Sequence, residues 1–407
     1  MKLKCNISLI SFIKETLLFM LFFPRFKPLF IEHMPEMDII NIIYKLMLVI
    51  SIFVSMFMYI WLMSKKKVLK KHFGFLFSTL LYFMIFIISS LINNQFALVN
   101  IIGSIASIIS FIMLIQITFI YYGKEIITLV SHFLQLLIII NSVIYWFKPY
   151  GLVQSSYYGN YIHFLANRNG LILIYFVVIA IMITDYYIRE NKLSFKKKIW
   201  IATIGLTIVP FKSGTATLCI IGMLIVMFVS NNIVRWFSYL KVWIIYAIVT
   251  VIMVFMRVTE YFEFIFSLVG KDTTLTGRTI IWKAAEEMIT ESFKSMIWGY
   301  GATTSITFYF NGKLLSSHNM IIEMLLRGGA IALLMYIVVI IYCKKEHSKE
   351  RKVNYQYNCY INVILLFALL ASLTETPVFS PYIFIIMTLI NISSDLVKAS
   401  TKERMLC

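Results

Sequence analysis

Aspartate is scarce in this chain of 407 residues, which has only four, at Asp38, Asp185, Asp272 and Asp395. No two of them form a DxD pair, so the usual device for holding a metal-bound nucleotide sugar is missing. The chain also lacks GxxxxGK(S/T), HExxH and GxSxG motifs, which argues against ATP-driven transport, zinc proteolysis and a serine elbow. We therefore expect any catalysis to need no metal and no cofactor, and to use cationic side chains, a histidine and oriented dipoles.

Cysteine is equally sparse, and its five residues are scattered along the chain. None of them has the CxxC spacing that marks metal-binding or redox pairs. Neither a cysteine-based metal site nor a disulfide framework is therefore expected. The positions are Cys5, Cys219, Cys343, Cys359 and Cys407.

Charged residues make up only 14% of the chain, whereas hydrophobic residues make up 60% and the mean hydropathy is +0.85. These values lie far outside the range of soluble globular proteins. Apolar runs of about 17 to 25 residues recur along the whole length, and each can cross the core of a bilayer. The predicted fold class is an all-α polytopic membrane protein with about twelve transmembrane helices. We place them near residues 5–24, 40–63, 73–93, 96–121, 126–147, 169–188, 199–211, 214–232, 239–257, 319–343, 359–376 and 380–396.

The first of these spans has two interpretations. Lys14 and Glu15 interrupt its apolar run, so an interfacial helix is an alternative to a transmembrane one. The segment has no convincing small-residue cleavage site, and we do not interpret it as a removable signal peptide.

Basic residues cluster in short turns between the predicted spans. The turns read SKKKVLKKH at 64–72, RENKLSFKKK at 189–198 and KKEHSKERK at 344–352, and residues 235–241 carry another basic stretch. All four lie on one side of a twelve-span chain, and the positive-inside rule makes that side, with both termini, cytoplasmic. The net charge of +18 is thus mainly a topology signal, and no nucleic-acid partner is expected.

One connection is much longer than the others and lies on the opposite, outer side. It divides the chain into residues 1–256 with nine spans, a polar loop at 257–318, and residues 319–407 with three spans and a short cytoplasmic tail. A long polar loop on a membrane scaffold is the natural place for chemistry.

Part of this loop has the periodicity of a short amphipathic helix. The apolar residues of Thr273–Ser292 recur on one face, which predicts a helix that lies on the membrane surface. Thr276 is placed to cap the helix, and Arg278 to lie in its first turn. Further along, Gly299-Tyr300-Gly301 indicates a tight backbone turn close to a ligand.

Three cations from separate parts of the sequence, Arg168, Lys212 and Arg278, fall on the outer side. Arginine and lysine are the usual partners of phosphate groups, so this set suits a diphosphate at the level of the lipid headgroups. Taken singly, Arg168 and Lys212 also fit interfacial anchors that extend toward the headgroups. His318 is a candidate acceptor for the proton of an attacking sugar hydroxyl.

His318 opens the tenth predicted span and is followed at helical spacing by Asn319, Glu323 and Arg327. Glu323 and Arg327 form an i,i+4 pair near the mouth of a membrane helix, where an unpaired charge is costly. Two interpretations stay open: the pair only neutralises itself, or it lines a polar entry beneath the loop.

The long loop contains several motifs in a particular order. This order resembles the O-antigen ligase and Wzy-type polysaccharide polymerase superfamily of bacterial membrane proteins, whose twelve-span layout is similar as well. The motifs lie within about residues 160–345. They are Leu275-Thr276-Gly277-Arg278 with Trp282 after three further residues, Gly299-Tyr300-Gly301, Ser317-His318-Asn319 and Gly328-Gly329.

The resemblance implies a metal-independent, inverting glycosyltransferase on the outer face of the bacterial cytoplasmic membrane. It would polymerise undecaprenyl-diphosphate-linked oligosaccharide units into capsular, exo- or O-antigen polysaccharide. Arg278 matches the loop arginine proposed to bind the donor diphosphate, and His318 matches the histidine proposed to activate the acceptor hydroxyl. The implied partners are the lipid-linked oligosaccharide, the bilayer, and a flippase and chain-length regulator of the same pathway.

The resemblance also places a set of supporting residues around these two. Lys212 and Ser213 stand where many members have a Ser-Arg pair. Here Gly214 follows the serine and the arginine is absent, so Lys212 would have to supply that charge, beside Arg168. Arg327 departs from the acidic residue that often precedes the glycine of this region. The supporting residues are Ser213, Gly277, Trp282, Gly299, Gly301, Asn319 and Glu323.

Two other functions remain open from the sequence. A ligase would transfer a finished glycan once to a different acceptor, and motifs and topology do not separate it from a polymerase. A secondary transporter or lipid-oligosaccharide flippase would show internal repeats and broken or charged helices near the midplane. We find no obvious repeat between the two halves of the chain.

Overall fold

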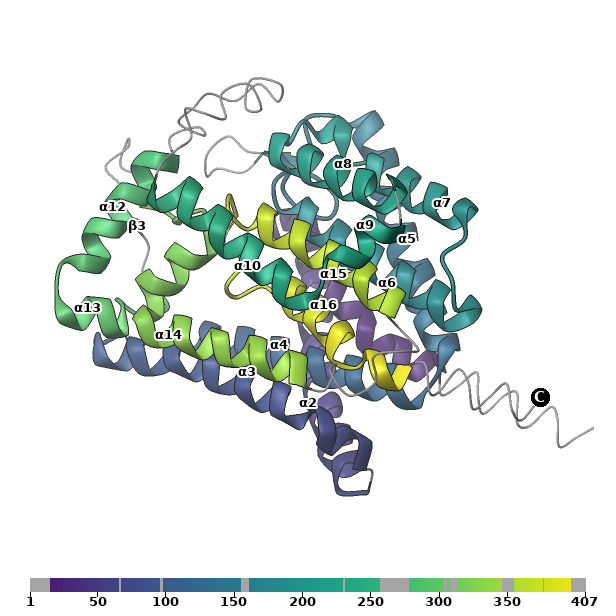
Figure 1. The fold of residues 1–407 in the computed structure, drawn as a ribbon, viewed down its shortest axis with the longest axis horizontal. Coiled ribbons are helices and arrows are strands. Elements are labelled where there is room, and N and C mark those ends of the chain that lie inside the picture. Colours follow the sequence, from purple (N-terminus) through teal and green to yellow (C-terminus); the bar gives the residue numbers. More distant parts are fainter. Residues whose placement is uncertain are drawn as a thin grey trace, which may run out of the picture.

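The structure, a computed structural model, is built almost entirely of helices (Figure 1). It describes residues 15–65, 67–95, 98–154, 161–229, 231–256, 278–303, 306–307, 314–345, 355–375 and 377–396. Gly277 and the predicted cap Thr276 lie outside the described residues.

The first half of the chain is dominated by long apolar helices that match the second to sixth predicted spans. Residues 15–22 are helical as well, and three short 3-10 turns then lead into the first long helix. The elements are η1 (Phe23–Phe26), η2 (Leu29–Glu32), η3 (Pro35–Met37), α2 (Asp38–Lys65), α3 (Lys67–Ile92), α4 (Val99–Tyr121), α5 (Lys124–Phe147) and α6 (Leu171–Glu190), with a two-residue ribbon β1 (Val153–Gln154) and β2 (Tyr161–Ile162) before α6.

The second half has shorter helices. The seventh predicted span ends early because Pro210 and the left-handed backbone of Lys212 turn the chain after α7. The elements are α7 (Phe195–Leu206), η4 (Val209–Phe211), α8 (Gly214–Val229), α9 (Asn231–Trp236), α10 (Tyr239–Thr250), the π-helical turn η5 (Val251–Phe255), α14 (Met320–Lys345), α15 (Tyr355–Ala371) and α16 (Tyr382–Asn391).

Within the described residues, six helices are long and apolar enough to cross a membrane, and four shorter apolar helices accompany them. The chain is therefore a multi-pass all-α membrane protein, as predicted. The number of twelve spans, and the choice between a transmembrane and an interfacial first segment, remain predictions.

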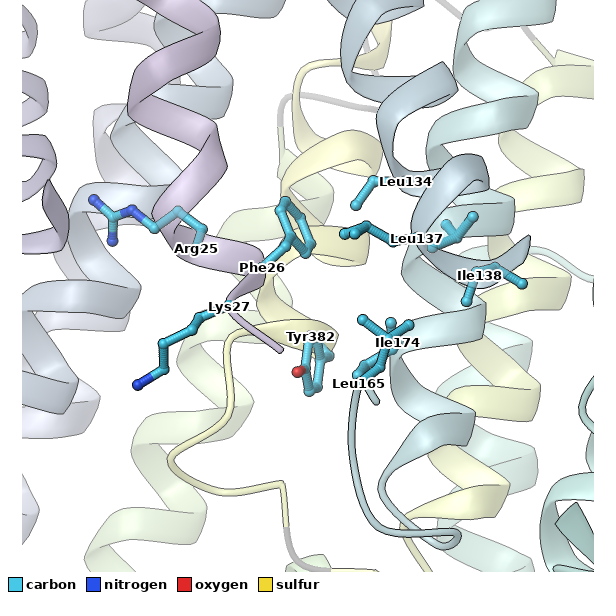
Figure 2. A pocket seen from close by; sticks show the side chains of 10 residues that line it. Arg25, Phe26, Lys27, Leu134, Leu137, Ile138, Leu165, Ile174 and Tyr382 are labelled. Carbon is cyan, nitrogen blue, oxygen red and sulfur yellow. The ribbon is translucent and has the colours of Figure 1, made fainter. Parts of the chain in front are cut away.

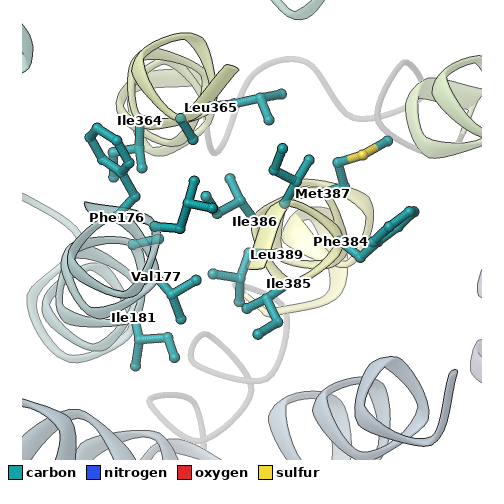
Figure 3. Close-up of a cluster of buried hydrophobic side chains, with 14 of the residues drawn as sticks. Phe176, Val177, Ile181, Ile364, Leu365, Phe384, Ile385, Ile386, Met387 and Leu389 are labelled. Atoms are coloured by element: carbon teal, nitrogen blue, oxygen red, sulfur yellow. The ribbon is translucent and has the colours of Figure 1, made fainter. Parts of the chain in front are cut away.

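The core is centred on α6, whose apolar side chains are buried on all sides. A helix that is apolar all round belongs inside a bundle rather than against lipid. Figure 3 shows Phe176 and Val177 of α6 facing Ile364 of α15 and Ile386 of α16. Next to this bundle, the start of α8 and the segment after α15 are joined by the hydrogen bond between Thr374 and Thr215.

The long loop folds into two short helices and a small ribbon, as far as it is described. They are α12 (Arg278–Thr290), α13 (Phe293–Trp298), β3 (Ile306–Thr307) and β4 (Leu314–Leu315). The predicted amphipathic helix contains α12, but its apolar face packs inside the protein. Ile281, Trp282 and Ala285 are buried against Ile322 and Leu326 of α14. The apolar periodicity therefore serves packing on α14 and not contact with the membrane surface.

Helix α14 is broken at Gly329, where φ is 65° and ψ is −166°. The part after the break lies beside α3, and the part before it bends toward α12 at one end of the molecule (Figure 1).

Candidate active site

Arg278 begins α12, as the sequence predicts, and its guanidinium faces an acidic residue. Its Nη2 lies 3.4 Å from Oε1 of Glu375, and the two side chains are only 12% and 18% exposed. Burial lowers the pKa of Arg278 from its usual value, and the charge of Glu375 opposes this. The guanidinium stays protonated at neutral pH, since arginine does not lose its charge in proteins. The site thus holds a shielded cation with one long ionic contact.

His318 lies immediately before α14 with a left-handed backbone, at φ 50°. Its Nδ1 is buried and has no hydrogen-bond partner among the described residues. Burial and the nearby charge of Arg278 lower the pKa of His318 from 6.5 to about 4, against the opposite effect of Glu323. The imidazole is therefore neutral at physiological pH, which is the state that can accept a proton.

Ser317 fixes the backbone on which His318 is carried. Its amide and its hydroxyl both donate to Oε2 of Glu323, at 2.9 and 2.5 Å. Its carbonyl oxygen accepts a hydrogen bond of 3.0 Å from Nε1 of Trp282 on α12. The left-handed residue that follows is thereby held from α14 and α12 together, which non-glycine residues in this conformation require.

Asn319 acts as the cap of α14. Its Oδ1 accepts from the amides of Ile321 and Ile322 at 3.0 and 3.1 Å, which satisfies two of the free donors at the start of a helix. Its Nδ2 donates to the carbonyl oxygen of Leu373 at 3.2 Å. The residue therefore has a structural explanation: it orients the helix that begins beside His318.

Residues 372–375, which follow α15, connect the parts of the site, and the sequence analysis missed them. Met320 donates its amide to the carbonyl oxygen of Ser372 at 3.0 Å, and Thr374 lies 3.2 Å from the hydroxyl of Thr215 at the start of α8. Glu375 then faces Arg278. A signal was present: Glu375 is the only acidic residue in the eleventh predicted span, and it stands at the outer end.

The other two predicted cations are not joined directly to this centre. Lys212 has a left-handed backbone and an exposed side chain, and Ser213 beside it contacts Oδ1 of Asn169 at 3.2 Å. Arg168 is exposed, and its charge, after burial, helps to lower the pKa of His163 to about 4. No hydrogen bond or ion pair within the described ranges links Lys212 or Arg168 to Arg278 or His318. Their part in diphosphate binding stays a prediction.

Gly299 and Gly301 pack against the break in α14, where no ligand is needed to explain them. The amides of Tyr300 and Gly301 donate to the carbonyl oxygens of Leu326 and Arg327 at 2.8 and 3.0 Å, which the break leaves without helical partners. A Cβ on Gly299 would lie 2.7 Å from the backbone of Arg327, and one on Gly301 would lie 2.4 Å from Gln95. Close approach of a neighbouring backbone explains Gly299, and close contact with the side chain of Gln95 together with a φ of 95° explains Gly301.

Two pockets lie between the helices of the described residues. One, between α12 and the start of α14, is lined mainly by apolar residues, among them Val254, Trp282, Ile289 and Ile322. The other lies between the N-terminal turns, α5 and α6 (Figure 2). Figure 2 shows Arg25 pointing away from its apolar lining, and that guanidinium is engaged by oxygens of three serines, Ser51, Ser107 and Ser110. Arg25 therefore serves to join α2 and α4.

Comparison with known proteins agrees with the order of motifs. Residues 199–337 match a family model described as O-antigen ligase, which confirms the resemblance to that superfamily. The match begins in α7 and ends in α14, so it includes Arg278 and His318 but not Glu375. No curated protein matches the chain, and no solved structure does.

Proposed function

We propose that this multi-pass membrane protein, with its O-antigen ligase match at residues 199–337, polymerises lipid-diphosphate-linked oligosaccharide units by metal-independent glycosyl transfer. The observation that carries the proposal is the pairing of Arg278 and His318. They are separated by a long stretch of loop, yet Trp282, one turn after Arg278 on α12, donates to the carbonyl oxygen of Ser317, the residue before His318, at 3.0 Å. Burial, and after it the charge of Arg278, lowers the pKa of His318. The closeness of a cation suited to a diphosphate and a candidate base supports the proposal.

The reaction follows from these two groups. The acceptor hydroxyl attacks the anomeric carbon of the donor, a new C–O bond forms, and the bond to the diphosphate breaks with its electron pair on the leaving oxygen. His318 takes the hydroxyl proton, and Arg278 stabilises the charge that develops on the leaving group. One displacement from the opposite face inverts the anomeric centre. The undecaprenyl-diphosphate leaves with its negative charge.

Binding of the donor would also change the strength of the base. In the free protein the charge of Arg278 helps to hold the pKa of His318 near 4, which makes it a weak proton acceptor. A diphosphate at Arg278 brings negative charge to the same place and displaces the long contact with Glu375. The pKa of His318 would then rise toward its ordinary value, so that the base becomes effective only when the donor is bound.

The pocket beside α12 supports a lipid-linked donor. Arg278, Trp282 and Ile289 recur at helical spacing on one face of α12, and the last two line the pocket. A diphosphate at Arg278 therefore has an apolar surface within reach for the first part of its lipid chain.

A transporter or flippase is the second candidate, because broken membrane helices occur in transporters and α14 is broken. In transporters such breaks leave backbone groups that bind substrate. Here the carbonyl oxygens of Leu326 and Arg327 at the break accept hydrogen bonds from Tyr300 and Gly301. This arrangement favours a structural break.

The test uses purified protein in nanodiscs with an undecaprenyl-diphosphate-linked repeat unit, chelator and no nucleotide sugar, followed by a gel for glycan length. We expect a ladder from the wild type. His318→Ala should lower the rate about 10²- to 10⁴-fold, and Arg278→Ala about 10²-fold or more, since each removes one group that acts in the transition state.

The matched control is Lys148→Ala, an exposed cation on the predicted outer side that has no hydrogen bond or ion pair with Arg278 among the described residues. It should retain most of the activity. A single discrete transfer to an added acceptor would favour a ligase over a polymerase. Absence of any glycan change with several repeat units, together with uptake of the lipid-linked unit into vesicles, would favour transport.

A further inference from the structure

We propose that Arg327 is a positioning residue: it connects the Gly-Tyr-Gly loop, which α3 holds, to Glu323, and through Glu323 it sets the backbone and the charge environment of His318. The inference rests on the proposed function for its activity measurements, but its main test needs no activity. It also concerns a position at which this chain departs from the motif pattern of the family that it resembles.

The first step is the anchoring of the loop by the outer end of α3. Asn93 donates to the carbonyl oxygen of Gly299 at 3.0 Å, and Gln95 donates to that of Tyr300 at 2.8 Å. The amide of Ala302 donates to the hydroxyl of Ser90 at 2.9 Å. Side chains from the last turn of α3 and the residues just after it thus bind neighbouring residues of the loop, so the loop is fixed relative to α3.

The second step runs from the loop into α14. Nη1 of Arg327 donates to the carbonyl oxygen of Ala302 at 2.5 Å, while its Nε and Nη2 each lie 2.6 Å from Oε1 of Glu323. The rigid fork of a guanidinium lets one side chain make both contacts, which a lysine would not reproduce. Arg327 is therefore the link between the loop and the carboxylate.

The third step ends at the candidate base. Glu323 is 2% exposed, and its other oxygen accepts from the amide and the hydroxyl of Ser317, the residue before His318. Glu323 thus holds Ser317 with one oxygen and faces Arg327 with the other. The left-handed backbone of His318 thus depends on Glu323, and Glu323 depends on Arg327.

The contacts from Ala302 through Arg327 to Glu323 also affect the pKa of His318. Within the described residues, the charged groups around it are Arg278 on α12, with its partner Glu375 after α15, and Glu323 with Arg327 on α14. Arg278 lowers the pKa of His318 and Glu323 raises it. Arg327 neutralises Glu323, so its removal would leave the carboxylate to act on the imidazole at full strength.

The experiment measures the titration of His318 by its modification with diethyl pyrocarbonate, which attacks only neutral imidazole, with mass spectrometry of the His318 peptide between pH 3.5 and 8. In the wild type the midpoint should lie near pH 4. Arg327→Met should raise it by about one unit or more, the effect expected of a nearby uncompensated charge. Glu323→Gln should leave it at or below the wild-type value, and the double variant Glu323→Gln/Arg327→Met should return close to it.

Activity separates the charge of Arg327 from its geometry. Arg327→Lys keeps the charge, so its midpoint should match the wild type, but kcat should fall at least about tenfold with little change in KM, because a lysine cannot hold both Ala302 and Glu323. His33, which is exposed, provides an internal control peptide whose midpoint should not move in any variant.

Two results would overturn the proposal: an unchanged midpoint in Arg327→Met, or full activity in Arg327→Lys. If Arg327→Met does not fold, the kcat of Arg327→Lys still decides the matter. Absence of glycan transfer by the wild type would contradict the proposed function alone, since the midpoints do not depend on it.

Discussion

At the scale of single residues, the proposed chemistry depends most on the pKa of His318. Its Nδ1 is buried without a partner among the described residues, and its neighbours carry charges of both signs. The pKa of such a group changes when a charged ligand binds at Arg278. Catalytic sites commonly use burial and neighbouring charges in this way to match a pKa to its task.

This dependence predicts two different pH profiles. The acid limb of kcat/KM reports the free protein, in which the pKa of His318 is lowered to about 4, so activity should be lost only as the pH falls through about 4. The acid limb of kcat reports the complex, where the bound diphosphate offsets Arg278, so it should lie at higher pH. Steady-state rates with the lipid-linked substrate between pH 3.5 and 8 give both limbs.

Replacement of Arg278 by glutamine provides the control for these profiles. Burial, the main cause of the lowered pKa of His318, remains in this variant, but the charge of Arg278 is lost, so the acid limb of its residual kcat/KM should move upward from about 4. Coincident limbs in the wild type, with no movement in the variant, would show that His318 is not the base.

At the scale of elements, the break in α14 is the feature that shapes the site. The break leaves the carbonyl oxygens of Leu326 and Arg327 without helical partners, and they accept hydrogen bonds from the amides of Tyr300 and Gly301. Ser89 of α3 also donates to the carbonyl oxygen of Arg327, at 2.8 Å. A helix, a loop and a neighbouring helix are thus joined at a single point.

The break predicts a strong requirement for glycine at position 329. A Cβ there would lie 2.1 Å from the carbonyl oxygen of Ile297, and its φ of 65° strains any other residue. Gly329→Ala should therefore destabilise the fold by about 2 kcal/mol or more. The apparent melting temperature in detergent, followed by size-exclusion chromatography, measures the effect.

Gly103 in α4 is the matched control, because a Cβ there would meet no atom within 4 Å. Gly103→Ala should leave the melting temperature unchanged or raise it slightly, since alanine is the better helix former. Equal melting temperatures of the two variants would contradict a tight contact at the break.

Across the whole molecule, α3 is held at both of its ends. Near its start, Nε2 of His72 lies 2.7 Å from Asp395, and Lys71 lies 3.1 Å from the same carboxylate. Near its outer end, Asn93 and Gln95 hold the loop. This helix therefore joins the predicted cytoplasmic side to the candidate site.

Topology gives a prediction at this scale. Lys148 and Lys192 are exposed residues that follow the ends of two successive helices, Lys148 after α5 and Lys192 after α6, which at 20 residues is about 30 Å long. In a background without the native cysteines, a membrane-impermeant maleimide should label Lys148→Cys on intact cells. Lys192→Cys should react only after the cells are permeabilised, because the basic turn that contains it is predicted to be cytoplasmic.

Unpermeabilised cells that express the cysteine-free protein serve as the control, and they should remain unlabelled. Labelling of Lys192→Cys on intact cells, or of both sites alike, would contradict the orientation and would move the candidate site to the wrong side of the membrane for the proposed reaction.

The sequence by itself determined the class of fold, the position of most apolar helices and two residues of the candidate site. Apolar runs and basic turns are local patterns, and the cost of exposing polar backbone to lipid makes them decisive for membrane helices. Arg278 and His318 stood out for a similar reason, because a charged residue and a histidine within one long polar loop are visible without knowledge of packing.

Tertiary structure alone decided which groups meet. Glu375 comes to Arg278 only because α12 begins close to where α15 ends, and Arg327 links Ala302 to Glu323 only because α14 breaks at Gly329. The apolar face of α12 likewise packs on α14 and not on the membrane, a choice that periodicity leaves open. Contacts between distant segments depend on packing, and short-range patterns in a sequence carry no record of it.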